Sequence, residues 1–247
     1  NMQNNTENDI LQLPEKIAIE KGIQIVICID EFQQISDFED SKTFQKKLRS
    51  VWQLQQHVSY CLFGSKKHLM NELFEKKNLP FYKFGDAIYL AKIETKYWIE
   101  YICKRFENTG KHISPELAEE ICRLVDNHSS YVQQLSWLLW IRTINTATTE
   151  QLSYALEDLL DQNNILFQSE TENLSAYQMN FLKAIVDGIH TKFSSKEVIS
   201  KYNLGTSANI VRLKNALLQK ELIETNGKEI VLADPVFGVW FKKEMLY

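Results

Sequence analysis

The stretch Ile23-Gln24-Ile25-Val26-Ile27-Cys28-Ile29-Asp30-Glu31-Phe32 decides the fold. Its first seven residues are mostly Ile and Val, which favours a strand, and the run is too short to span a membrane. A strand this apolar is expected to be buried on both faces, as in a parallel sheet covered by helices. Because a buried strand does not accommodate charge, Asp30 and Glu31 are expected at its carboxyl end, the edge where open α/β sheets bind ligands.

Two adjacent carboxylates after an apolar strand form the Walker B pattern. In phosphoryl transfer the first carboxylate holds a magnesium ion, and an adjacent one positions or deprotonates the attacking water. These two roles fall on Asp30 and Glu31. The alternative is a strand end that carries two solvated acids and no chemistry.

The composition is that of an ordinary globular protein. The chain has 247 residues, 44% hydrophobic and 24% charged, which is enough for more than one domain. No apolar run reaches the roughly 18 residues of a transmembrane helix, and the polar start does not resemble a secretion signal, so a cytoplasmic protein is expected. The four cysteines stand singly and are expected to be reduced core residues: Cys28, Cys61, Cys103 and Cys122.

A second apolar run, residues 58–63, is expected to pair in parallel with the first strand. Residues 41–57 lie between them with apolar side chains at helical spacing and are expected to form the crossover helix. Ser65 follows the second strand at the same edge of the sheet, where a polar group can sense the terminal phosphate of a nucleotide; the alternative role is a helix N-cap. Residues 87–90 are expected to form a third short strand.

These elements resemble the prokaryotic P-loop ATPases of the AAA+/STAND type, the archaeal-ATPase-like family. The resemblance rests on Ile27-Cys28-Ile29-Asp30-Glu31-Phe32-Gln33-Gln34-Ile35, Phe63-Gly64-Ser65-Lys66-Lys67-His68-Leu69-Met70 and Pro80-Phe81-Tyr82. It implies that Asp30 is the magnesium-associated acid, that Glu31 is the catalytic acid and that Ser65 is sensor 1. It also implies ATP and Mg²⁺ as cofactors.

The family's phosphate-binding loop, G-x-x-x-x-G-K-[ST], does not occur in the 247 residues. Its amides and lysine cradle the phosphates, so ATP and Mg²⁺ are expected to bind only where that segment is supplied. A truncated chain, a fragment and a degenerate family member all fit this pattern. In the family's strand order the absent strand lies between residues 58–65 and residues 87–90. We therefore expect either that these two strands close onto each other or that a second copy fills the gap in a homodimer.

The rest of the chain predicts two further domains after a nucleotide-binding core at residues 1–93. Residues 94–168 are helical throughout and match the lid subdomain that the resemblance implies. Residues 169–247 contain two S-x-x-E/Q capping boxes, which start at Ser175 and Ser194, a third amphipathic helix and the hairpin turn Asn226-Gly227. Together these elements make a winged helix. The expected fold class is α/β, a partial parallel P-loop ATPase sheet, followed by an all-α lid and a C-terminal winged helix.

A winged helix often reads DNA through its third helix, on which Asn209, Arg212 and Lys214 are polar. The net charge of the chain is −4, and residues 172–247 carry ten Lys and Arg against eight Asp and Glu. An excess of two positive charges is small for a surface that neutralises the phosphates of DNA. We therefore favour the docking of a protein partner over DNA reading, with weak or no binding of nucleic acid.

Two classes of function stay open. The first is an ATP-hydrolysing switch of the STAND type, which is expected to be inactive without the phosphate-binding loop. The second is a DNA- or protein-binding winged-helix regulator on a vestigial ATPase core. Arg49 and Arg105 are weak candidates for an arginine finger.

Overall fold

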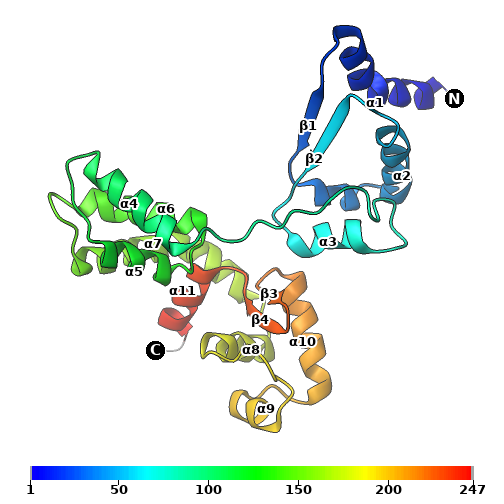
Figure 1. Cartoon of the computed structure of the whole chain (residues 1–247). Coiled ribbons are helices and arrows are strands. Elements are labelled where there is room, and N and C mark those ends of the chain that lie inside the picture. The colour runs from blue at the N-terminus through cyan, green and yellow to red at the C-terminus, as the bar shows by residue number, and fades with distance from the viewer. Residues whose placement is uncertain (1, 246–247) are drawn as a thin grey trace. The chain divides into compact units, whose positions relative to one another are not determined.

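The computed structural model describes residues 2–245, with the side chains of residues 7–66 and 68–245. The chain forms two compact units, Asn1–Tyr89 and Leu90–Tyr247, and each is described by itself (Figure 1). Among the described residues, no helix combines the length and the apolar character that crossing a bilayer requires.

The first unit is a strand–helix–strand motif with flanking helices. Its elements are α1 (Met2–Lys21), β1 (Ile25–Ile29), the 3₁₀ helix η1 (Phe32–Asp37), α2 (Ser41–Trp52), β2 (Val58–Leu62) and α3 (Lys67–Glu75). β1 and β2 pair in parallel, with Ile25 opposite Val58 and Ile29 opposite Leu62, and Figure 1 shows them side by side. The predicted parallel pair with a crossover helix is confirmed.

One face of this sheet is bare. Val26 lies opposite Ser59 and Cys28 lies opposite Cys61, and all four residues are exposed, Val26 to 65%. The other face packs against a core cluster from η1, α2, α3 and the following loop. The prediction that the first strand is buried on both faces is therefore wrong, because no described element covers the second face.

The cysteines follow this division. Cys122 is buried and Cys103 is half-buried, whereas Cys28 and Cys61 are exposed on the bare face. The prediction of four core cysteines is thus wrong for the two in the sheet. All four are free thiols.

The predicted third strand does not form. Residues 87–90 are irregular, and the side chains of Ile88 and Leu90 are 84% and 92% exposed. Within the described part of the chain, the sheet contains β1 and β2 and no further strand. A strand needs a backbone partner in a sheet, and no described strand pairs with residues 87–90, so the predicted closure onto residues 58–63 is wrong. The homodimer stays a prediction.

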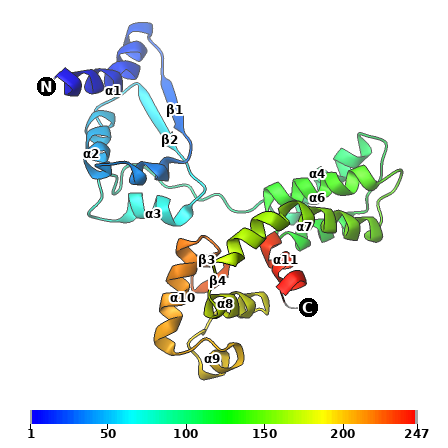
Figure 2. The ribbon, with the colours of Figure 1, turned by 180° about the vertical axis from the view of Figure 1, so that it is seen from behind.

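The second unit is helical, with one hairpin. Its elements are α4 (Thr95–Glu107), α5 (Pro115–Leu124), α6 (Ser129–Arg142), α7 (Thr149–Glu172), α8 (Ala176–Val186), α9 (Lys196–Tyr202), α10 (Ser207–Gln219), β3 (Ile223–Asn226), β4 (Glu229–Leu232) and α11 (Pro235–Met245). The capping box at Ser175 is confirmed, whereas the one predicted at Ser194 is wrong, because Ser195 is the N-cap of α9 and its side chain accepts from the Val198 amide. The Asn226-Gly227 turn joins β3 and β4, which Figure 2 shows from behind with α8 and α10.

Helix α7 connects helices α4 to α6 with the elements that follow it, which are α8 to α10, the hairpin and α11. Its Phe167 ring lies 5.5 Å from the ring of Phe237 and 5.6 Å from that of Trp240, both on α11. Trp240 Nε1 also donates to Asn164 Oδ1 across 2.8 Å. One hydrophobic core runs through the whole second unit as a result. The division of residues 90–247 into a lid and a winged helix at the predicted boundary stays a prediction.

Candidate functional site

The parallel pairing brings three predicted site residues to one edge of the sheet. Asp30 and Glu31 follow β1 directly, and Ser65 follows β2 after Phe63 and Gly64. The hydroxyl of Ser65 donates to Glu31 Oε2 across 3.2 Å. Residues 34 positions apart thus meet where both strands end.

Asp30 is exposed, and its Oδ1 accepts a hydrogen bond from the Glu31 amide across 2.8 Å. The chain turns after the strand, and Glu31 takes the left-handed backbone conformation with φ 49°. The turn directs the chain into η1, whose N-cap is Glu31. The two carboxylates therefore stand on a turn rather than on a continuation of the strand.

The Glu31 carboxylate accepts two side-chain hydrogen bonds. Ser65 Oγ and Gln33 Nε2 both donate to Oε2. The Ser65 hydroxyl, followed by the Gln33 amide, lowers the pKa of Glu31 below its usual value, since both bonds favour the charged form. The two donors therefore hold the ionised carboxylate in place at the edge of the sheet.

Gln33 is the site residue that sequence reasoning missed. Its side chain is only 2% exposed, and its Oε1 has no hydrogen-bond partner among the described residues. A Cβ added at Gly64 would lie 1.9 Å from this oxygen, so the Gln33 amide occupies the space that any other residue at position 64 would fill. A glutamine two positions after the acid pair is the one available sequence signal, and a lone polar residue of this kind does not reveal burial.

Ser65 does not cap the helix that follows it. The N-cap of α3 is Lys66, and its side chain makes no capping hydrogen bond. The N-cap alternative for Ser65 is therefore wrong, because its hydroxyl is turned toward Glu31 instead.

The two arginine-finger candidates have local partners. Arg49 donates to the carbonyls of Pro80 and Tyr82 and lies 5.6 Å from the ring centre of Phe84. These contacts tie α2 to the loop after α3. Arg105 lies 5.1 Å from the ring centre of Tyr101 on its own helix.

The three polar residues predicted for α10 differ in their surroundings. Asn209 Nδ2 donates to the Leu204 carbonyl across 3.0 Å, which fixes the turn before the helix. Arg212 is exposed and Lys214 is half-buried. Val211, beside Arg212, is 61% exposed, which adds an apolar group to this surface.

The hairpin next to α10 is acidic. Glu224 on β3 and Glu229 on β4 are both exposed, against one lysine at the turn, Lys228. Carboxylates repel the phosphates of DNA, so this wing does not extend the cationic surface of α10.

Comparison with known proteins identifies the fold. Residues 165–243 match a family described as a probable winged helix domain. The structure also aligns with a Walker-type ATPase of Pyrococcus abyssi at a TM-score of 0.72 and 17% identity, over 95% of this chain and 67% of that chain. The fold is that of a P-loop ATPase with a C-terminal winged helix. The resemblance drawn from the sequence is thereby confirmed at the level of the fold.

Two other solved structures are similar at lower TM-scores. They are the RuvB Holliday junction branch migration motor of Thermotoga maritima (0.43, 13% identity, 90% of this chain and 70% of that one) and the ORC1 protein of Aeropyrum pernix in complex with DNA (0.43, 10% identity, 89% and 64%). No match was found among curated proteins.

P-loop ATPases use a nucleotide and Mg²⁺. Of these two, the residues present fit the binding of Mg²⁺. Carboxylate oxygens such as those of Asp30 are ligands that Mg²⁺ prefers, with water and phosphates completing the shell. Among the described residues, no three His, Cys, Asp or Glu side chains cluster as a closed metal site. The nucleotide requires the glycine-rich loop that cradles its phosphates, and this motif does not occur in the 247 residues.

Proposed function

We propose that the chain is the C-terminal part of an ATP-binding and ATP-hydrolysing switch of the STAND type. In this proposal Asp30 holds Mg²⁺ through water, Glu31 accepts a proton from the attacking water and Ser65 senses the terminal phosphate. Residues 1–93 are the carboxylate-bearing part of the core, residues 94–168 are the lid and residues 169–247 are the winged helix.

The hydrogen bond from Ser65 to Glu31 is the observation that carries the proposal. It places a hydroxyl and an ionised carboxylate together at the carboxyl edge of a parallel sheet, the position at which α/β folds bind ligands. A general base must be ionised to accept a proton, as a glutamate is at neutral pH, and the two hydrogen-bond donors hold this carboxylate at the edge of the sheet. When bound, the magnesium nucleotide supplies the phosphoryl group and the charge that Asp30 balances.

The bare sheet face supports a second part of the proposal. Val26 on this face is 65% exposed, although valine favours burial. We propose that a strand ahead of the phosphate-binding loop pairs beside β2, and that the helix after the loop packs on this face and completes the nucleotide site. The 247 residues alone then bind no nucleotide tightly and turn none over.

A chimera tests this function. The strand, phosphate-binding loop and following helix of the Pyrococcus abyssi ATPase are joined ahead of residue 2, and the rate of ATP hydrolysis is measured. We expect turnover that Glu31→Gln lowers about 10²–10⁴-fold with nucleotide still bound, because glutamine keeps the shape but accepts no proton. Asp30→Ala should instead weaken the magnesium-dependent binding of ATP.

Glu39→Gln is the matched control, because Glu39 is an exposed acid of the same unit. This variant should hydrolyse ATP at the rate of the parent chimera. If Glu31→Gln also does so, Glu31 has no part in the reaction. A folded chimera that binds ATP and hydrolyses none would remove the catalytic role from this edge of the sheet.

The second candidate function is that of a DNA- or protein-binding winged-helix regulator on a vestigial ATPase core. Exposed Arg212 on α10 favours it, whereas the acidic wing limits DNA contact. We expect DNA binding to be weak, insensitive to sequence and lost by about 200 mM salt, as for a few phosphate contacts. Fluorescence anisotropy with unrelated duplexes measures this, and nanomolar, sequence-selective binding would favour the regulator instead.

A further inference from the structure

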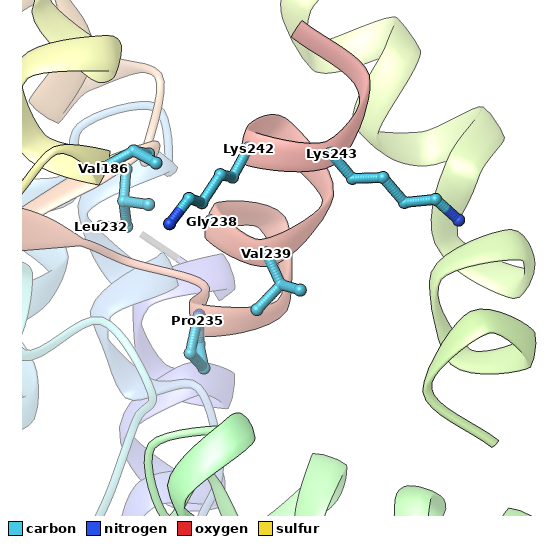
Figure 3. A pocket seen from close by; sticks show the side chains of 7 residues that line it. All are labelled: Val186, Leu232, Pro235, Gly238, Val239, Lys242 and Lys243. Carbon is cyan, nitrogen blue, oxygen red and sulfur yellow. The ribbon is translucent and has the colours of Figure 1, made fainter. Parts of the chain in front are cut away.

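A groove on the second unit lies between α11 and the ends of α8 and β4. Its volume is about 540 Å³, and Figure 3 shows the residues that line it: Val186, Leu232, Pro235, Gly238, Val239, Lys242 and Lys243. None of them belongs to α10, so the groove is separate from the surface that winged helices turn toward DNA.

The groove results from the way α11 packs. The buried side chains of this helix enter the shared core: Val236, Phe237, Trp240 and Phe241. Gly238 lets α11 approach β4 closely, since a Cβ here would lie 2.7 Å from Cδ1 of Leu232. Pro235 and Val239 flank this glycine and remain half-buried. The apolar lining is thus held in place by a helix that is itself firmly anchored.

Two lysines give the apolar groove a positive rim. Lys242 and Lys243 are exposed, and neither forms an ion pair with a residue that the structure describes. Figure 3 shows Lys242 reaching past Gly238 toward Val186 and Leu232, whereas Lys243 extends in another direction. The ammonium groups are therefore available to carboxylates of a bound partner.

We infer that this groove binds an acidic amphipathic segment of a partner protein. Apolar side chains of the segment lie on Leu232 and Val239, and its carboxylates pair with Lys242 and Lys243. The apolar lining favours a partner that buries apolar side chains on it, and the backbone of a nucleic acid has none. Two lysines also make too few phosphate contacts to hold a nucleic acid. Amphipathic segments in hydrophobic grooves are a general mode of peptide recognition. The inference does not depend on the ATPase proposal.

The test is fluorescence anisotropy with the full chain and a labelled peptide of about 14 residues, or four helical turns, made of Leu at helical spacing and Glu elsewhere. A peptide with Lys in place of Glu reports on the charge, and one with the same residues in scrambled order reports on the apolar face. Anionic phospholipid vesicles are titrated in parallel. The variants are Lys242→Glu with Lys243→Glu, and separately Val239→Asp, each checked for folding by circular dichroism.

We expect saturable binding of the Leu–Glu peptide, weakened at least about tenfold by either variant, which corresponds to about 1.4 kcal/mol. The matched control is Lys220→Glu with Lys228→Glu, an equal charge change outside the groove, and it should weaken binding less than about twofold. The inference is overturned if the peptide does not bind, if the Leu–Lys or scrambled peptide binds equally well, or if the control loses as much affinity. Binding of vesicles without binding of peptide would make the groove a membrane contact instead.

Discussion

The hydroxyl of Ser65 lies 3.2 Å from the carboxylate of Glu31 and donates a hydrogen bond to it. The bond joins the ends of β1 and β2, and it favours the ionised form of the acid. The contact therefore both links the two strand ends and lowers the pKa of Glu31, and the stability and the pKa can each be measured.

Ser65→Ala should raise the pKa of Glu31 toward its usual value. A carboxyl whose pKa is lowered in the folded state adds stability above its unfolded pKa of about 4.3, and this is lost as the pH falls through the folded pKa. The variant should thus be less stable than the parent at neutral pH, with the difference vanishing in acid. Carbon-detected NMR titration of Glu31 measures the shift. Ser59→Ala, at an exposed position of β2, is the control and should leave the Glu31 titration unchanged.

Gly64→Ala should destabilise the first unit through the Gln33 side chain. The new Cβ would meet Gln33 Oε1 at 1.9 Å, and such overpacking costs about 1–3 kcal/mol. Gln33→Ala removes the atom that clashes, so the double variant should lose less stability than the sum of the single variants. Urea unfolding of the parent, the two single variants and the double variant gives the coupling energy between positions 33 and 64. Strict additivity would show that the two residues do not meet.

Thiol labelling should show two cysteines that react fast and two that react slowly. Cys28 and Cys61 are exposed, whereas burial raises the pKa of the Cys103 thiol and raises that of Cys122 to about 11. The thiolate is the reactive form, so the latter two should react slowly at neutral pH. Ellman's reagent with Cys28→Ser and Cys61→Ser assigns the fast phase. In the chimera that carries the phosphate-binding segment, protection of both fast thiols is expected; unchanged rates would mean that the bare face stays uncovered.

Isothermal titration of the 247-residue chain with magnesium-ATP should give no saturable heat. The absent loop would supply several charge-assisted hydrogen bonds, each worth roughly 1.5–3 kcal/mol. Asp30→Ala should therefore give the same flat titration as the parent chain. A micromolar dissociation constant that Asp30→Ala abolishes would contradict the expectation that the site is incomplete.

Glu170→Gln should raise the melting temperature of the second unit at pH 7 to 8 by a few degrees. Burial, followed by the charge of Asp234, raises the pKa of Glu170, so its ionised form opposes folding. That penalty is fully present above the folded pKa and disappears below the unfolded pKa of about 4.3. Differential scanning calorimetry at several pH values shows the crossover. Glu172→Gln, exposed on the same helix, should have no such pH-dependent effect.

Local sequence signals determined the elements and the order of the site residues. The Ile- and Val-rich run predicted β1, and the residues that directly follow it, Asp30 and Glu31, could stand only at its carboxyl end. The capping box at Ser175 and the Asn226-Gly227 turn predicted where a helix and a hairpin begin. These features depend on a few neighbouring residues, because capping, turn geometry and side-chain period are set by the backbone nearby.

The tertiary structure decided which of these side chains are covered and which groups they contact. Val26 is as apolar as its neighbours yet exposed, and Gln33 is polar yet buried under Glu31. Residues 87–90 have the composition of a strand, yet no strand in the described part of the chain pairs with them. Burial and pairing depend on elements distant in the sequence, so no local pattern contains them. The sequence by itself therefore determined where the carboxylates stand, whereas only the fold decided that Ser65 and Gln33 hold one of them.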